Sequence, residues 1–206
     1  MASIADMTVA PPSSRDRELT LRGRIVAAAA RATVESGWSS VTMGKLAELA
    51  GVSRQTVYNE IGGKRQLAEA IVLAELQNFL TAVDAAFEAY PEDLVNAVRR
   101  ACHNVLVLAT KTPLLHAIVS ASHGAGHDLL PLLTTQSATL IETAKTVLRK
   151  HVEATAPALP ARELDVAIDT VVRTVLSHIM QPSASPDRTA DDIALLVERF
   201  LAGISS

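Results

Sequence analysis

The chain has 206 residues, of which 49% are hydrophobic and only 3% aromatic, and its formal net charge is −3. This length suffices for a large buried core, and the low glycine and proline content favours helices throughout. Taken alone, the negative net charge argues against a nucleic-acid partner. The single cysteine, Cys102, excludes an intrachain disulfide and fits a reducing cytoplasm. We expect it to be a small core residue on a helix.

The charge is unevenly distributed along the chain. Residues 1–65 carry nine Lys or Arg against six Asp or Glu, a net charge of +3, and the remaining residues carry ten against sixteen, a net charge of −6. Phosphate groups are attracted by the first part and repelled by the second. An N-terminal nucleic-acid contact therefore remains compatible with the composition.

The N-terminal region predicts an arm followed by one helix. Residues 1–17 mix small residues with two prolines and serines, which predicts a flexible arm and not a signal peptide. A helix is expected from about residue 20 to 36, where Gly37 ends it, and Trp38 is expected to fill the space before the next helix. The residues expected to face inward are Ile25, Ala28, Ala29, Ala32 and Val34.

Residues 42–64 read TMGKLAELAGVSRQTVYNEIGGK and predict a helix-turn-helix. Thr42 can cap a short helix, Gly51 can form a tight turn, and Ser53 can cap a second helix. The second helix would bury Val57 and Ile61. The planar and hydroxyl side chains that it would present outward are Arg54, Gln55, Thr56, Tyr58 and Asn59. Such groups reach base edges and phosphates, so the motif indicates duplex DNA as the partner.

The rest of the chain predicts a helical body. Helices are expected over about 64–89, 91–111, 112–123, 128–154, 161–180 and 190–203. The fold is therefore expected to be all-α, with a three-helix DNA-binding head at 18–65 joined by a long helix to a ligand-binding and dimerisation body at 66–206. No apolar run looks long and charge-free enough to span a bilayer, so we expect a cytoplasmic protein without membrane association.

The last two helices carry wide apolar stripes. More apolar surface than one face can bury predicts packing against the same pair in a second subunit. The alternative is that both helices close the core of the monomer. The residues assigned to dimerisation are Ile168, Val172, Val175, Ile193, Leu196 and Phe200.

Together, the helix ending at Gly37, the Thr42 helix, GVSRQTVYNEIGGK and the long following helix resemble the TetR family of bacterial transcriptional regulators. The resemblance implies a homodimeric repressor that binds a palindromic operator and is released by a small ligand. It implies phosphate contacts by Thr42, Tyr58 and Lys64, and a major-groove position for Arg54, Gln55 and Thr56. The DNA-binding set expected on this basis is completed by Lys45, Ser53 and Asn59.

Four positions depart from the family pattern. Glu60 places an acid where a neutral or basic residue is usual, so it either turns away from DNA or accepts a hydrogen bond from a cytosine amino group. Gly62-Gly63 precedes Lys64 in place of a Pro-Ser-like pair, and Ile61 replaces an aromatic residue. The glycine pair is expected to loosen the joint between the recognition helix and the long helix.

The body is rich in aliphatic residues and poor in aromatic ones. This composition favours an aliphatic or lipid-like effector, such as an acyl chain, over a flat aromatic compound, although an empty core needs the same residues. The candidate ligand-binding residues are His103, Leu106, His116, Val119, His123, Leu133, Leu140 and His178. His151 is expected to be exposed.

Other chemistries have weaker support in the sequence. A metal-responsive regulator could use His116, His123 and His127, although the two nearby glycines break their spacing. A helical-bundle hydrolase could use Ser120 or Ser122 with His123 or His116, but nothing specifies that geometry. We therefore expect no enzyme activity, no metal and no cofactor.

Overall fold

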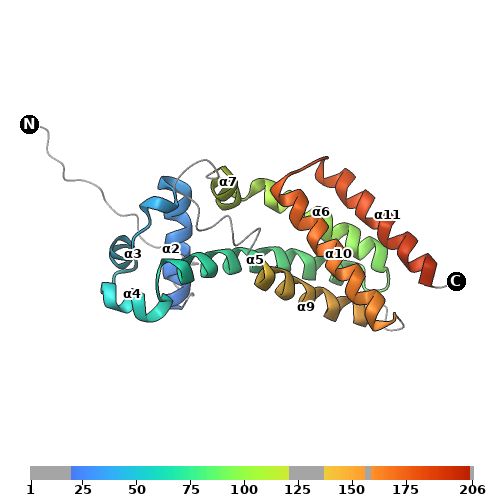
Figure 1. Ribbon diagram of the computed structural model, residues 1–206, viewed down its shortest axis with the longest axis horizontal. Helices are drawn as coiled ribbons and strands as arrows, with labels where there is room; N and C mark the ends of the chain where they lie inside the picture. The colour runs from blue at the N-terminus through green and yellow to red at the C-terminus, as the bar shows by residue number, and fades with distance from the viewer. Residues whose placement is uncertain (1–19, 121–136, 156–158, 205–206) are drawn as a thin grey trace, which may run out of the picture.

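A computed structural model describes residues 20–120, 137–155 and 159–204, and every regular element in this part is a helix (Figure 1). The elements are α2 (Leu21–Ser36), the short 3-10 helix η1 (Trp38–Ser40), α3 (Met43–Ala50), α4 (Arg54–Ile61), α5 (Lys64–Ala89), α6 (Leu94–Lys111), α7 (Pro113–Ser120), α9 (Ala138–Thr155), α10 (Ala161–Met180) and α11 (Pro186–Ile204). The all-α prediction is confirmed. The predicted arm at 1–17 lies outside the described residues.

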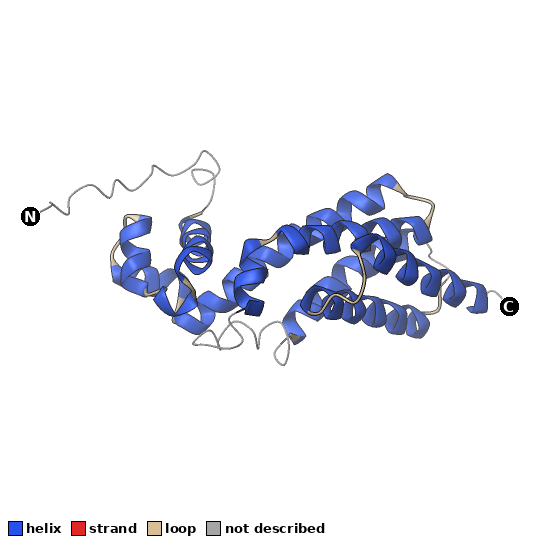
Figure 2. Ribbon diagram, turned by 90° about the horizontal axis from the view of Figure 1, so that it is seen from above, coloured by secondary structure: helices blue, strands red, loops and turns tan. Residues whose placement is uncertain are grey.

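The molecule is elongated, with a head at one end and a body at the other (Figures 1 and 2). The head consists of α2, α3 and α4, and the body contains α6, α9, α10 and α11. Helix α5 starts beside the head and continues into the body, where it packs against α6 and α9. Helix α7 belongs to the body by sequence but packs against α2 of the head.

The predicted helix caps of the head are confirmed. The Thr42 hydroxyl accepts a hydrogen bond from the backbone N–H of Lys45 at 3.2 Å, and the Ser53 hydroxyl accepts one from the N–H of Thr56 at 3.0 Å. Gly51 ends α3 with φ +68°, a left-handed conformation that favours glycine. These local signals determine where the two helices of the helix-turn-helix begin and end.

The core of the head follows the predicted periodicity, with one exception. Val57 and Ile61 are buried, and Trp38 is buried as the predicted plug. Val34 was expected to face inward but is 43% exposed. Thr33 occupies the inward position because its hydroxyl can donate to the carbonyl of Ala29 at 2.8 Å, which satisfies the polar group inside the core.

The joint between α4 and α5 is hydrogen-bonded on both sides. The N–H of Gly62 donates to the carbonyl of Tyr58 at 2.8 Å, and the N–H of Gly63 donates to the Gln66 side chain at 3.0 Å. Gly62 has φ +89°, and a Cβ placed on it would lie 3.3 Å from Gln66 Cγ. Gly62 therefore adopts a backbone conformation that residues with a side chain rarely adopt.

Most body helices begin and end close to their predicted limits, but the last one does not. Helix α11 begins at Pro186, ahead of the predicted start at residue 190, because proline is well suited to the first position of a helix. Helix α6 is capped by Asp93, whose carboxylate accepts from the N–H of Asn96 at 3.0 Å and has its pKa lowered by that hydrogen bond. The segment at 121–136, where parts of two helices were expected, lies outside the described residues.

The expectation that no segment is long and apolar enough to span a membrane is wrong for helix α5. By length and composition alone, the Lys64–Ala89 helix qualifies. However, residues such as Leu67, Ile71 and Phe87 are buried in the protein core, where α5 packs against α2, α6 and α9. Its apolar character therefore belongs to a core helix and does not indicate a membrane protein.

We expect Gly62→Ala to destabilise the protein by about 1–3 kcal/mol, because alanine strongly disfavours the positive φ at this position. Urea denaturation measures the change. Gly44→Ala is the matched control: Gly44 lies in helix α3 with ample space for a methyl group, so this variant should lose no stability. Equal stability of the two variants would contradict the role assigned to Gly62.

Candidate nucleic-acid interface and effector cavity

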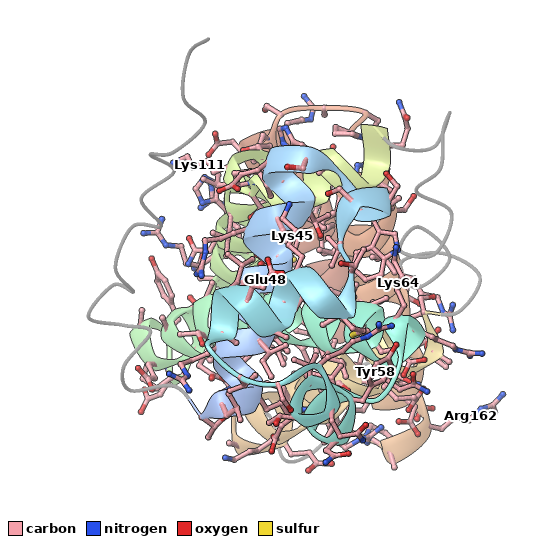
Figure 3. All side chains as sticks on the ribbon, turned by 90° about the vertical axis from the view of Figure 1, so that its left-hand side faces the viewer. Lys45, Glu48, Tyr58, Lys64, Lys111 and Arg162 are labelled. Atoms are coloured by element: carbon pink, nitrogen blue, oxygen red, sulfur yellow. The ribbon has the colours of Figure 1, made fainter. Side chains whose placement is uncertain are left out.

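The outer surface of the head carries the predicted DNA-binding residues. The exposed members of this set are Thr42, Lys45, Ser53, Arg54, Gln55, Tyr58 and Asn59, whereas Thr56 and Lys64 are half-buried. The view onto the head shows Lys45, Tyr58 and Lys64 at this end of the molecule (Figure 3). The structure thus brings the predicted residues together on the α3–α4 side of the head.

Side-chain contacts along α4 hold its polar groups in register. Gln55 donates to the side-chain oxygen of Asn59 at 3.0 Å. The Arg54 guanidinium donates to the Tyr58 hydroxyl at 3.4 Å and lies 5.6 Å from the centre of its ring. Because arginine has five N–H donors, this single contact leaves most of the guanidinium able to bind another partner.

Lys64 connects the base of α5 to the core of the head. Its ammonium lies 4.9 Å from the centre of the Trp38 ring, a cation–π contact. Residues 20–65 carry seven Lys or Arg and three Asp or Glu, a net charge of +4. The acids Glu48 and Glu60 lie on α3 and α4, and Glu60 is half-buried while its backbone carbonyl accepts a hydrogen bond from Arg22.

A cavity of about 130 Å³ lies in the body between α5, α6, α7, α9 and α10. Its described lining is aliphatic apart from Phe79, Cys102 and Glu75. The Glu75 carboxylate is 3.5 Å from both the Thr112 hydroxyl and the Asn78 amide, so its polar contacts are long. We call this space the aliphatic cavity.

A second cavity, of about 420 Å³, lies where the ends of α6 and α10 meet α7 and the start of α11. Its lining residues include His116, which is also exposed at the surface, His178 and Thr189. His178 Nδ1 lies 3.3 Å from the Ser183 hydroxyl. Leu115 and Ile179 line both this histidine cavity and the aliphatic cavity.

Of the predicted ligand-binding residues, some line one of the two cavities, and others have side chains that the structure does not describe. Leu140 lines the aliphatic cavity, whereas Leu106, His116 and His178 line the histidine cavity. Val119 lies on α7, but its side chain, together with His123 and Leu133, is outside the described residues.

His103 lies outside the lining of both cavities. The Nε2 of this histidine lies 3.2 Å from the Asp187 carboxylate, where α6 packs against α11. Its Nδ1 is buried and has no hydrogen-bond partner among the described residues. The helix pair α6–α11 uses this histidine, which sequence position alone could not reveal.

Sequence reasoning missed the contribution of α5 and α10 to the aliphatic cavity. The missed lining residues include Leu76, Phe79 and Leu80 from α5, and Val171 and Leu176 from α10. Most of the predicted ligand-binding residues lie between residues 103 and 140; from α10 only His178 was included, and the other α10 residues named were assigned to dimerisation. The signal that could have found these residues is the breadth of the apolar stripe on α5, which is wider than one neighbouring helix can cover.

The predicted dimerisation residues differ in how far they are exposed on the monomer. Ile168, Val172 and Ile193 are buried inside the monomer, and Val172 and Val175 line the aliphatic cavity, so these residues close the monomer core. Leu196 is 63% exposed, and Phe200 is half-buried. The other large apolar residues exposed on these helices are Val166 and Leu195.

His151 is not exposed as expected. Its Nε2 lies 2.7 Å from the Asp84 carboxylate, and its ring stacks on Phe87 with 4.7 Å between the ring centres. Both partners lie on α5, so His151 joins α9 to that helix. The long-range pairing explains why the sequence around residue 151 gave no sign of it.

The alternatives of a metal site and a hydrolase site gain no support in the described part of the chain. There, no group of three His, Cys, Asp or Glu residues could hold a metal ion. His123, His127 and Ser122 lie outside this part, and the side chain of Ser120 is not described.

The fold and the head define a class of protein. A helix-turn-helix with a polar outer face, carried by a helical body that contains an apolar cavity, is the architecture of a DNA-binding transcriptional regulator. Residues 25–71 match the family of bacterial regulatory proteins called the tetR family, and residues 93–199 match the C-terminal domain of the bacterial tetracyclin repressor. The chain belongs to the TetR family and is a regulator, not an enzyme.

Individual relatives support this assignment. The chain is 28% identical over 199 residues to the HTH-type transcriptional regulator AlkX of Mycobacterium tuberculosis, covering 97% of this chain and 93% of the relative. The TetR family repressor AlkX of Dietzia sp. strain DQ12-45-1b, implicated in biodegradation of n-alkanes, has a similar structure: TM-score 0.74, 27% identity, 89% of this chain and 96% of that one. QsdR of R. erythropolis shares the fold, with TM-score 0.60, 15% identity and coverage of 90% and 95%.

The Cys102 thiol should be unreactive in the native protein. Burial raises the pKa of this thiol to about 12, so almost none of the reactive thiolate forms at pH 8. We expect a thiol-specific disulfide reagent to modify Cys102 only after the protein unfolds in denaturant. Modification of the native protein at the rate of a free thiol would contradict the burial.

Proposed function

We propose that this protein is a dimeric, ligand-responsive repressor that binds a palindromic operator and is released by a small aliphatic effector. The observation that carries the proposal is the aliphatic cavity, because its walls include α5 and α7, the two body helices that reach the head. An occupant of the cavity therefore contacts the elements that position the DNA-binding surface.

The outer surface of the head has the groups required to bind duplex DNA. The free N–H groups at the start of α3, beside Thr42, can bind a phosphate, and Lys45 and Lys64 add positive charge nearby. Arg54 can read guanine with two parallel hydrogen bonds, and Gln55 can pair in a similar way with adenine. Phosphate contacts would set the position of α4, and α4 would read the sequence.

Arg54 and Lys64 should differ in their effects on DNA binding. Arg54→Ala should cost about 1–3 kcal/mol and relax the preference at one base position, because a base-reading side chain is lost. Lys64→Ala should weaken binding to all sequences alike. It should also reduce the magnitude of the slope of log affinity against log salt concentration by about one. Gel-shift titrations on a palindromic duplex and its single-base variants measure both effects. Binding of the intact protein without any sequence preference would contradict base reading.

The outer sides of α10 and α11 are the candidate dimer interface. One head reads only half of a palindrome, so a second copy must be held beside it. Val166, Leu195 and Leu196 expose between 50% and 63% of their surface on these helices. Burial against a second copy would remove this apolar surface from water.

We expect Leu196→Glu to convert the dimer to a monomer, because a symmetric interface would bury two unpaired carboxylates. Leu73→Glu is the matched control, since Leu73 is also an exposed leucine, 40% accessible, but lies on α5. Light scattering coupled to gel filtration at micromolar concentration gives the mass of each variant. A monomeric native protein, or a dimeric Leu196→Glu variant, would contradict this interface.

The effector is proposed to be aliphatic because the lining of the aliphatic cavity has few groups that could bind an aromatic or a polar ligand. Phe79 is the single aromatic residue in its described lining, so a flat ring finds few stacking partners there. The association of the Dietzia AlkX repressor with n-alkane degradation points in the same direction. A flexible hydrocarbon chain gains free energy simply by leaving water.

Straight-chain compounds should therefore release the protein from its operator. Titration of octane and 1-octanol into the protein–operator complex, followed by fluorescence anisotropy of labelled DNA, measures release. Naphthalene and Zn²⁺ serve as controls for a planar aromatic ligand and for a metal. Release by either control, together with no release by the octyl compounds, would refute the aliphatic effector while leaving DNA binding intact.

A further inference from the structure

The aliphatic cavity and the histidine cavity meet at two side chains. Leu115 from α7 and Ile179 from α10 line both spaces. Because the two spaces share these residues, they are direct neighbours in the body. The two cavities can therefore act as two ends of one site.

The aliphatic cavity cannot accommodate a polar head group well. Apart from the Glu75 carboxylate, its described lining is apolar except for the Cys102 thiol, so an anionic head group inside it would lose its bonds to water without replacement. The carboxylate of Glu75, on its wall, would in addition repel an anion. Only an alkyl segment suits this end of the site.

The histidine cavity has the complementary chemistry. His116 and His178 contribute imidazoles from two different helices, and no Asp, Glu, Lys or Arg belongs to its described lining. An imidazole can donate or accept a hydrogen bond, and it can carry a positive charge. Nδ1 of His178 lies beside the Ser183 hydroxyl, so Nε2 is the ring nitrogen that a head group would contact.

The sizes of the cavities also favour shared occupancy. The aliphatic cavity, at about 130 Å³, is close to the roughly 150 Å³ of an apolar cavity that accepts benzene. A chain that also carries an oxygen-bearing head group needs a polar space beside this apolar one. The histidine cavity, at about 420 Å³, provides the remaining room.

We propose that the two cavities together bind one straight-chain amphiphile, with its alkyl tail in the aliphatic cavity and an oxygen-bearing head group, a hydroxyl or a carboxylate, beside His116 and His178. This inference rests on the proposed function and specifies its effector. His116 and His178 then determine specificity, because they distinguish an amphiphile from a plain hydrocarbon of the same length.

Calorimetric titration of the full-length protein with octane, 1-octanol and octanoate tests this assignment. At least one of the two oxygen-bearing compounds should bind with an affinity about ten times that of octane, or higher. The double variant His116→Ala/His178→Ala should lose this advantage while octane binding and operator affinity stay unchanged. The unchanged operator affinity also shows that the variant is folded.

Two further variants sharpen the test. In His116→Gln/His178→Gln, hydrogen bonding is kept but positive charge is not possible, so the advantage of 1-octanol should be retained and that of octanoate reduced. Lys111→Ala removes a nearby cation that lines neither cavity and should change nothing. A loss of octanoate binding in Lys111→Ala, with the histidine variants unaffected, would overturn the placement of the head group.

The outcomes separate this inference from the proposed function. If octane binds as tightly as both oxygen-bearing compounds and releases the operator, the two-part site is wrong and the aliphatic effector stands. If no octyl compound binds or releases the operator, both are wrong. If 1-octanol or octanoate binds best, the stronger of the two identifies the head group.

Discussion

One continuous helix joins the cavity to the DNA-binding surface. Helix α5, 26 residues and about 39 Å long, begins at Lys64, directly after the joint with the recognition helix, and forms a wall of the aliphatic cavity from Val72 to Val83. Its head end is held by the contact of Lys64 with Trp38, and its body end by packing against α6 and α9. If α5 moves as a unit, as packed helices do in domain rearrangements, the proposed effector would shift the head by displacing this helix at the cavity.

Helix α7 provides a second connection. Leu114 and Leu115 face the aliphatic cavity, while the helix itself packs against α2 of the head. A ligand seated between α5 and α7 therefore contacts two elements that reach the same head. Ligand and DNA can oppose each other only to the extent that each prefers a different arrangement of these helices.

The sequence predicted local features better than long-range ones. Thr42, Ser53 and Gly51 were assigned correctly because helix caps and turns depend on a few neighbouring residues. The partners of His103 and His151 were not predicted, because Asp187 and Asp84 lie more than 60 residues away along the chain. The aliphatic character of the cavity followed from composition, but its lining depends on how α5 and α10 pack, and an apolar stripe does not show which neighbour covers it.

The linkage between the cavity and the head is tested most directly by the affinity of 1-octanol for the free protein and for the protein bound to its operator. Calorimetry measures both under the same salt and temperature. If α5 and α7 couple the two sites, bound operator lowers the affinity of the protein for 1-octanol by a certain factor. Bound 1-octanol then lowers the affinity for the operator by the same factor. Equal affinity of 1-octanol for the free and the DNA-bound protein would contradict the coupling.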